Sequence, residues 1–219
     1  FAKQMGVPFG KLICASNDNK VLYDFFRTGT YDKNREFILT TSPSMDILVS
    51  SNLERLLYLS CGRDAAKTKE LMEQLSNNGK YEITPEMKEF MKDFSAGYAD
   101  MEENAKEIKK VFDDTGYLID THTGVAAAVY EQYKAKTGDA TKTVIASTAS
   151  PYKFSRSVME AVLGKKEDAD EFALIDEMER ISGVKIPQAI EEIRDAKILH
   201  NRQCKPEEME ETVKQTFSK

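Results

Sequence analysis

The sequence predicts an α/β protein in which a mostly parallel, incomplete sheet is flanked by helices in three layers. Two short apolar runs, residues 11–15 and 143–146, have the pattern of buried strands, and each ends in a small polar loop. Segments with helical spacing and clear end signals fill most of the remaining chain. Because strands alternate with helices, we expect an α/β arrangement with helical elaborations at its periphery.

Helix signals follow the first strand in a regular order. A short helix closes at Gly29, and the next one presents three leucines on one face with Ser51 or Asn52 as its cap. The clearest helix has Asp100 as its cap and stops at Gly116. In chain order, the sequence predicts helices at residues 21–26, 53–57, 64–75, 85–92, 100–115, 125–133, 155–163, 170–182 and 206–217.

The later elements suggest a packed sheet. The helix at 125–133 is rich in alanine, and its small residues imply close packing against strands. Residues 143–146 are β-branched and apolar, as expected for a strand that is covered on both faces.

The composition restricts what the protein binds. Its 219 residues, 41% hydrophobic and 31% charged, are enough for one core or two small ones. A net charge of -6 offers no basic stripe for a nucleic acid. The nearly apolar run 125–130 is far shorter than the roughly 20 residues that span a bilayer. We therefore expect a cytoplasmic protein with neither nucleic acid nor a membrane among its partners.

The cysteines and histidines do not indicate a metal site. Cys14, Cys61 and Cys204 lie far apart, so reduced thiols are expected rather than a disulfide framework or a zinc cage. His122 and His200 are also isolated, and no metal is expected. Cys14 with His122 makes a poor nucleophile set, since an apolar thiol in the middle of a strand is usually core filler.

Three loops are candidates for a ligand site. Residues 16–19 and 147–150 follow the predicted strands, and residues 120–124 open a helix. In open α/β sheets, ligands bind beyond the carboxyl ends of the strands, where helix N-termini converge. Taken singly, each loop is better explained by helix capping than by ligand binding.

The chain opens on what looks like the last turn of a helix, since Gly6 and Pro8 follow a run of helix formers. Position 1 is Phe rather than Met, so we expect a preceding part of the polypeptide to be missing.

An ordered set of motifs across essentially the whole chain resembles threonine synthase. The strongest member is Ser-Met-Asp-Ile at 44–47 followed by Ser-Asn-Leu-Glu-Arg at 51–55. Some members of the family carry Pro where Thr121 stands and His where Ser150 stands. The other members of the set are 11–19, Phe-Phe-Arg-Thr-Gly at 25–29, Asp-Thr-His-Thr at 120–123 and Ser-Thr-Ala-Ser-Pro-Tyr-Lys-Phe at 147–154.

The resemblance implies an enzyme of fold type II that uses pyridoxal 5'-phosphate to convert O-phospho-L-homoserine and water into L-threonine and phosphate. In such enzymes a lysine in a Phe-Lys-Asp motif forms the Schiff base, and a Gly-Asn-Phe-Gly type loop holds the cofactor phosphate. Neither motif occurs in this chain. The resemblance therefore implies that the N-terminal half of the same polypeptide carries them, and that this chain alone is inactive and does not hold the cofactor.

The resemblance also implies a division of the chain. Residues 1–50 would be the remnant of the smaller α/β domain, and residues 51–219 would be the C-terminal part of the large cofactor-binding domain.

Site roles follow from the same match. The motif Ser-Thr-Ala-x-Pro assigns Thr148, with Ser147, to the cofactor, the Thr148 hydroxyl facing the pyridine nitrogen. Asn17, Asp18 and Asn19 fall where substrate binds in the family, although they could equally shape the turn. The guanidinium of Arg27 is suited to a substrate phosphate, but a surface ion pair explains this residue better.

Other functions remain open at this point. The roles of Thr121, His122, Ser150 and Lys153 are unassigned. The alternatives are another fold-type II lyase, such as threonine dehydratase, or a non-catalytic α/β ligand-binding module.

Overall fold

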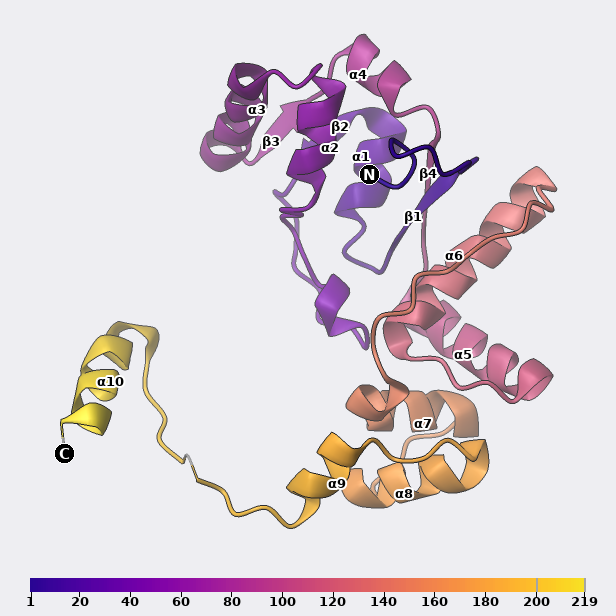
Figure 1. Cartoon of the computed structure of the whole chain (residues 1–219), viewed down its shortest axis with the longest axis vertical. Helices are drawn as coiled ribbons and strands as arrows, with labels where there is room; N and C mark the ends of the chain where they lie inside the picture. Colours follow the sequence, from indigo (N-terminus) through magenta and orange to yellow (C-terminus); the bar gives the residue numbers. More distant parts are fainter. Residues whose placement is uncertain (200, 219) are drawn as a thin grey trace. The chain divides into compact units, whose positions relative to one another are not determined.

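Two parallel strands, β1 (Leu12–Ser16) and β4 (Phe94–Tyr98), form the sheet on which the candidate site is built (Figure 1). The computed structural model describes residues 1–199 and 201–218. Leu12 pairs with Phe94, and Ser16 pairs with Tyr98. Because the strands are parallel, both carboxyl ends lie at one edge of the sheet. The polar turn that begins at Asn17 follows β1 directly at this edge.

Helices cover both faces of this sheet. Successive side chains of a strand point to opposite faces, and the contacts follow that alternation. On one face, Phe26 of α1 (Val21–Thr28) stacks on Phe94 with ring centroids 5.2 Å apart. On the other face, α6 (Thr121–Thr137) places Val129 in a small core that includes Ile13. The layers are therefore helix, sheet and helix, which confirms the predicted α/β class.

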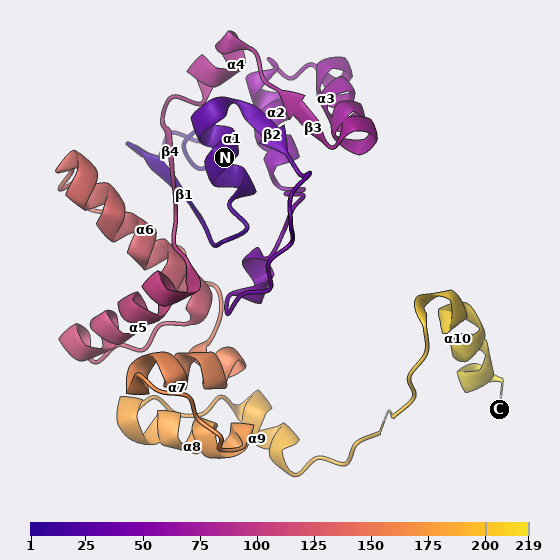
Figure 2. The same ribbon diagram turned by 180° about the vertical axis from the view of Figure 1, so that it is seen from behind.

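A larger core lies around a second, antiparallel pair of strands, β2 (Thr30–Asp32) and β3 (Lys80–Glu82). Tyr31 and Tyr81 stack with ring centroids 5.2 Å apart, and Phe25 and Leu57 are buried with them. Figure 2 shows the helices that surround this pair, which are α2 (Leu53–Ser60), α3 (Ala65–Asn78) and α4 (Pro85–Phe90). This core joins residues from both sides of position 50, and the predicted domain boundary there stays a prediction.

The helix ends follow the predicted signals closely. Asp64 caps α3, and Asp100 forms a capping box with Glu103 at the start of α5 (Met101–Thr115). Left-handed glycines end α1, α3, α5 and α6. The predicted cap of α2 is wrong, because the side chain of Asn52 makes no capping hydrogen bond. Its backbone is helical, whereas a capping side chain requires an extended residue.

The chain divides into two compact units, Phe1–Lys185 and Ile186–Lys219. The first unit also contains α7 (Ser155–Leu163) and α8 (Glu171–Ser182), and the second contains α9 (Gln188–Arg194) and α10 (Met209–Phe217). Short 3-10 turns occur at η1 (Pro43–Met45), η2 (Pro151–Phe154) and η3 (Pro206–Glu208). His200, expected to be isolated, lies outside the described residues. None of the helices in the described ranges has both the length and the apolar character needed to cross a bilayer.

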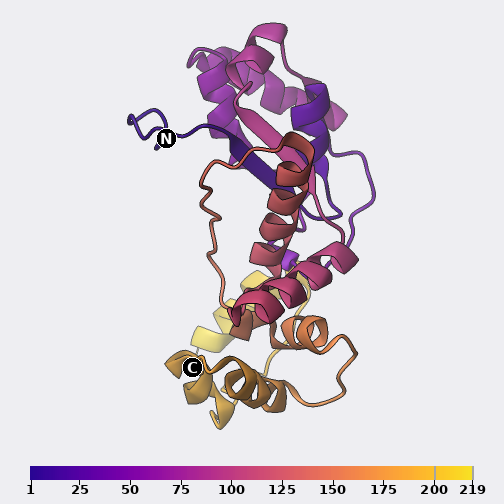
Figure 3. The same ribbon diagram turned by 90° about the vertical axis from the view of Figure 1, so that its right-hand side faces the viewer.

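One predicted strand is wrong. Residues 143–146 have no regular secondary structure, and Val144 is 85% exposed. Figure 3 shows the stretch after α6 as an extended segment drawn without a strand arrow. A strand forms only where another backbone completes its hydrogen-bond ladder, and no segment of the described residues pairs with 143–146. The sequence did not predict β4, because its residues Phe-Ser-Ala-Gly-Tyr include a glycine and no β-branched residue.

Candidate functional site

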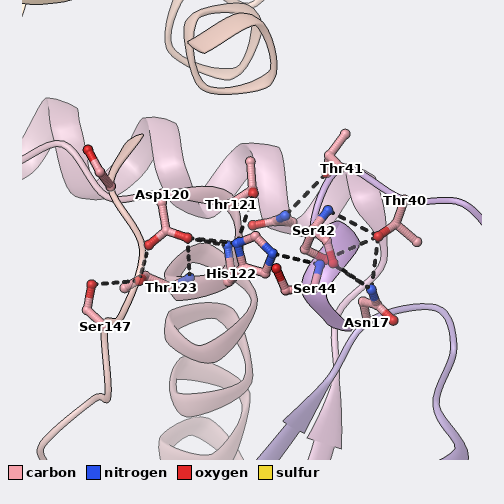
Figure 4. A network of polar contacts seen from close by, with 12 residues as sticks. Asn17, Thr40, Thr41, Ser42, Ser44, Asp120, Thr121, His122, Thr123 and Ser147 are labelled. Atoms are coloured by element: carbon pink, nitrogen blue, oxygen red, sulfur yellow. Dashed lines mark hydrogen bonds and ion pairs between the residues drawn. The ribbon is translucent and has the colours of Figure 1, made fainter. Parts of the chain in front are cut away.

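A network of polar contacts joins the three loops that the sequence singles out (Figure 4). Asn17 lies at one end of it and Ser147 at the other. Between them lie Asp120 and His122, at the start of α6, and the backbone of Ser44 in η1. The tertiary structure therefore brings the three loops together.

The end of β1 is fixed by two buried asparagines. Asn17 Nδ2 donates to Asp46 Oδ1 at 2.7 Å and lies 2.9 Å from Thr40 Oγ1 and 3.0 Å from Ser42 Oγ. Asn19 Nδ2 donates to the same oxygen of Asp46 at 3.1 Å, and its backbone amide donates to Asn17 Oδ1 at 3.0 Å. The Nδ2 group of Asn17 has two hydrogens, and protein acceptors already surround it. These contacts hold the turn against residues 40–46.

The carboxylate of Asp120 organises the start of α6. Its Oδ1 accepts the backbone amides of His122 at 2.8 Å and Thr123 at 3.4 Å, as a helix cap does. The same oxygen lies 2.9 Å from His122 Nδ1, and Oδ2 accepts the hydroxyl of Thr123. The side chain of Asp120 is 0% exposed. Capping and the contact with His122 therefore share one buried carboxylate.

The two residues assigned to the cofactor differ in their surroundings. Ser147 and Thr123 are joined by a hydrogen bond of 2.8 Å between their hydroxyls, so Ser147 is tied to the start of α6. Thr148 is exposed, on the extended segment after α6. Its hydroxyl is therefore accessible to a ligand.

Asp18 is the ionisable group of the 16–19 turn, and its surroundings disfavour its charge. Burial of the carboxyl raises the pKa of Asp18, and the nearby charge of Asp100 raises it further, while the backbone amides of Asp18 and Met101 lower it in part. The Oδ2 atom is buried and has no hydrogen-bond partner among the described residues. This oxygen is an unsatisfied acceptor at the carboxyl edge of the sheet.

Arg27 lies outside the network. It is exposed on α1, where its guanidinium donates to the hydroxyl of Tyr23 and lies 5.2 Å from the centre of that ring. Lys153 is also exposed. Ser150 caps η2 by accepting the amide of Tyr152 at 3.3 Å, a local role that the sequence left open.

Two cavities of the first unit differ in how they relate to the network. One of about 280 Å³ borders Thr41 and Thr121 and also contacts Lys165 and Lys166. A larger one of about 870 Å³ lies near the N-terminal segment, between residues of α2 and α3, and includes none of the predicted site residues. Size alone therefore does not identify the site, and we assign it from the polar network. Within the described residues, no group of His, Cys, Asp and Glu has the arrangement of a metal site.

Sequence reasoning did not assign the residues of the 40–46 loop. Asn17 forms hydrogen bonds with the side chains of Thr40, Ser42 and Asp46. Thr40 in turn donates to Asp46 from its amide, at 2.9 Å, and from its hydroxyl, at 2.7 Å. The Ser-Met-Asp motif marked this region, but no local spacing relates it to the strand end. Its partner lies 29 residues away in the chain.

Comparisons with known proteins agree on one family. Residues 123–201 match the family model described as "Threonine synthase, C-terminal". The chain is 34% identical to threonine synthase of Saccharomyces cerevisiae over 218 residues, which is 92% of this chain and 42% of that protein. It is 40% identical to human threonine synthase-like 1 over 164 residues, which is 74% of this chain and 22% of that protein.

Solved structures give the same result. The chain superposes with a TM-score of 0.68 and 35% identity on a structure of PLP-bound threonine synthase from Brucella melitensis, covering 84% of this chain and 38% of the other. For yeast threonine synthase, the TM-score is 0.71 with 32% identity, covering 84% and 39%. The chain thus spans less than half of the length of these proteins.

Proposed function

Because this chain belongs to the threonine synthase family and corresponds to its C-terminal part, we propose that it forms part of an enzyme that converts O-phospho-L-homoserine and water into L-threonine and phosphate. The observation that carries the proposal is the meeting of the three predicted loops in one polar network at the carboxyl edge of the sheet. That edge is where α/β proteins of this kind bind ligands.

Pyridoxal phosphate fits the hydroxyl groups that this chain offers. A ring nitrogen needs a hydrogen-bonding partner, and the exposed Thr148 can supply one. Ser147 holds the neighbouring backbone to Thr123, which orients the segment. When bound, the cofactor supplies an aromatic ring that accepts electrons from the substrate. A neutral hydroxyl pairs with the ring nitrogen without enforcing its protonation, in contrast to a carboxylate.

The substrate would lie between the two ends of the network. We assign Asn17, Asp18 and Asn19 to its surroundings, with Asn17 and Asn19 acting through the fixed shape of the turn. The family match suggests Arg27 for the substrate phosphate, through its planar donor set, but the guanidinium lies on Tyr23 outside the network, so this role stays a prediction. No residue of this chain matches the Schiff-base lysine motif, so the chain by itself is expected to be inactive.

The proposal is tested in the full-length polypeptide that contains this chain, by phosphate release from O-phospho-L-homoserine. Thr148→Val removes the hydroxyl and keeps the branched shape. We expect a fall in kcat/KM of about tenfold, in line with the loss of one hydrogen bond of about 1–1.5 kcal/mol. The cofactor absorption band should shift in the same variant. Thr143→Val is the matched control, because that threonine is exposed on the same segment and bonds the carbonyl of Thr141.

Two outcomes would argue against the proposal. If Thr148→Val and Thr143→Val both behave as the unaltered enzyme, the role of Thr148 is wrong. If the full-length protein releases no phosphate but releases ammonia from threonine, the reaction is that of a dehydratase.

A further inference from the structure

His122 links two segments that lie 78 residues apart in the chain (Figure 4). The backbone N–H of Ser44 donates to Nε2 of the imidazole at 3.0 Å. A backbone amide can only donate, so Nε2 must carry a lone pair. The ring proton then resides on Nδ1 and is donated to Asp120 Oδ1 at 2.9 Å. The contact therefore requires a neutral ring in one tautomer.

The surroundings fix the orientation of this ring. Asp120 is itself held by the first amides of α6, and the ring of Phe154 packs on the imidazole with centroids 4.6 Å apart. The His122 side chain is 14% exposed. Asp120 is the ionisable group in contact with it. The η1 turn carries no ionisable side chain, and η2 adds the buried Tyr152 and the exposed Lys153.

The backbone that His122 holds is the one that orders the end of β1. Ser44 lies within η1, between Ser42 and Asp46, and both of these bond Asn17. Apart from η1, residues 33–50 form no helix or strand. The position of the 40–46 loop therefore depends on side-chain contacts. Those from later parts of the chain are the hydrogen bond of His122 to the Ser44 amide, the contact of Asn104 Nδ2 with Thr41 Oγ1 at 3.5 Å and the packing of Met45 against the core that contains Val129.

We propose that His122 is a positioning residue, whose neutral ring fastens the 40–46 loop over the Asn17 turn and whose protonation releases it. A protonated ring has N–H groups at both nitrogens, so Nε2 then faces the Ser44 amide as a second donor. The consequence for substrate binding rests on the proposed function, whereas the hydrogen bond between His122 and the Ser44 amide does not depend on it. The loop holds Asp46, which bonds Asn17 and Asn19, so its release loosens the candidate substrate turn.

The test is nuclear magnetic resonance of this chain across a pH series. In the unaltered protein, ring nitrogen shifts should report the Nδ1–H tautomer at high pH. Hydrogen exchange of the Ser44 amide, corrected for the intrinsic effect of pH, should quicken by about tenfold as His122 becomes protonated, as loss of a hydrogen bond of about 1–1.5 kcal/mol implies. The amide of Gly124, which donates to the Asp120 carbonyl at 2.8 Å, is an internal control that should not change.

Two variants distinguish the effect of the hydrogen-bond acceptor at position 122 from the effect of the ring shape. His122→Phe keeps a ring against Phe154 and has no acceptor, so the Ser44 amide should exchange fast at every pH. His122→Gln retains an acceptor oxygen and does not titrate, so protection should persist at low pH.

The proposal is overturned if Ser44 exchange in the unaltered chain does not follow the titration of His122, or if His122→Phe leaves it protected. Should His122→Phe unfold α6, as fast Gly124 exchange would show, the unaltered chain and His122→Gln still decide the question. In the full-length enzyme, KM for O-phospho-L-homoserine should rise at low pH more in the unaltered protein than in His122→Gln. Absence of any phosphate release would contradict the proposed function and leave the Ser44 result valid.

Discussion

The thiol of Cys14 ionises less readily than an ordinary cysteine. Burial in β1 raises the pKa of Cys14 to about 11. By exposed surface, Cys14 and Cys61 are both half-buried, Cys61 with its sulfur 3.8 Å from Met87 Sδ, and Cys204 is exposed. The thiolate is the reactive form, so a raised pKa keeps Cys14 protonated at neutral pH. The interpretation of Cys14 as core filler rather than nucleophile is consistent with this environment.

These differences predict an order of alkylation. At about pH 8, iodoacetamide should modify the exposed Cys204 first and Cys14 last, because a thiol with a pKa of about 11 is ionised about a hundredfold less than a thiol of ordinary pKa. Peptide mass spectrometry at timed intervals measures the order. Cys204→Ser should abolish the fast phase. If Cys14 is modified as fast as Cys204 in the folded protein, burial does not suppress ionisation of the Cys14 thiol.

At the scale of elements, the packing of α6 depends on two glycines. A Cβ at Gly97 in β4 would lie 2.6 Å from Val129 Cγ1, and a Cβ at Gly124 would lie 2.2 Å from Asn104 Oδ1 and 2.8 Å from Ile108 Cγ1. The first glycine lets α6 approach the sheet, and the second lets it approach α5. The predicted close packing of this helix on strands is confirmed by its contacts with β1 and β4 and by Ala128, which shares a core with Ile13, and α6 also contacts α5.

Alanine at either glycine should destabilise the fold. Forcing a methyl group into these contacts is expected to cost about 1–3 kcal/mol. At Gly124, which lies in α6, the better helix propensity of alanine offsets about 1 kcal/mol of this cost. Gly97 lies in a strand and has no such compensation, so at equal steric cost Gly97→Ala should destabilise the fold more than Gly124→Ala. Urea unfolding measures the difference. Gly10→Ala is the control, because a Cβ there meets nothing within 4 Å. Equal stability of Gly97→Ala and Gly10→Ala would show that α6 can move away from the sheet at no cost.

At the scale of the whole molecule, apolar side chains remain exposed in separate parts of the first unit. Val144 is 85% exposed, and Phe1 and Met5 are exposed on the N-terminal segment. Scattered exposed apolar residues are ordinary, but an apolar extended segment without a ladder partner favours pairing with another chain.

This exposure predicts that the chain associates with itself at high concentration. Val144→Lys should lower the apparent mass measured by light scattering, because an ammonium group opposes strand pairing. Val184→Lys is a matched control, since Val184 is also exposed but is followed by no comparable β-branched run. If both variants associate as strongly as the unaltered chain, residues 143–146 are not the surface involved.

Local signals in the sequence determined most helices. Asp100 and Asp120 cap α5 and α6, and Gly116 and Gly138 end them. These ends depend on hydrogen bonds between residues a few positions apart, which the sequence displays directly. The order of motifs likewise identified the family, because it does not depend on contacts.

Only the tertiary structure decided which distant groups meet. β1 pairs with β4 across about 80 residues, Asn17 finds Asp46, and His122 finds Ser44. The run 143–146 has the intrinsic preferences of a strand and stays unpaired, because a ladder needs a second backbone that no local pattern specifies. Caps and turns are encoded within one or two helical turns of chain, whereas partners in a sheet or a polar site are chosen by the fold as a whole.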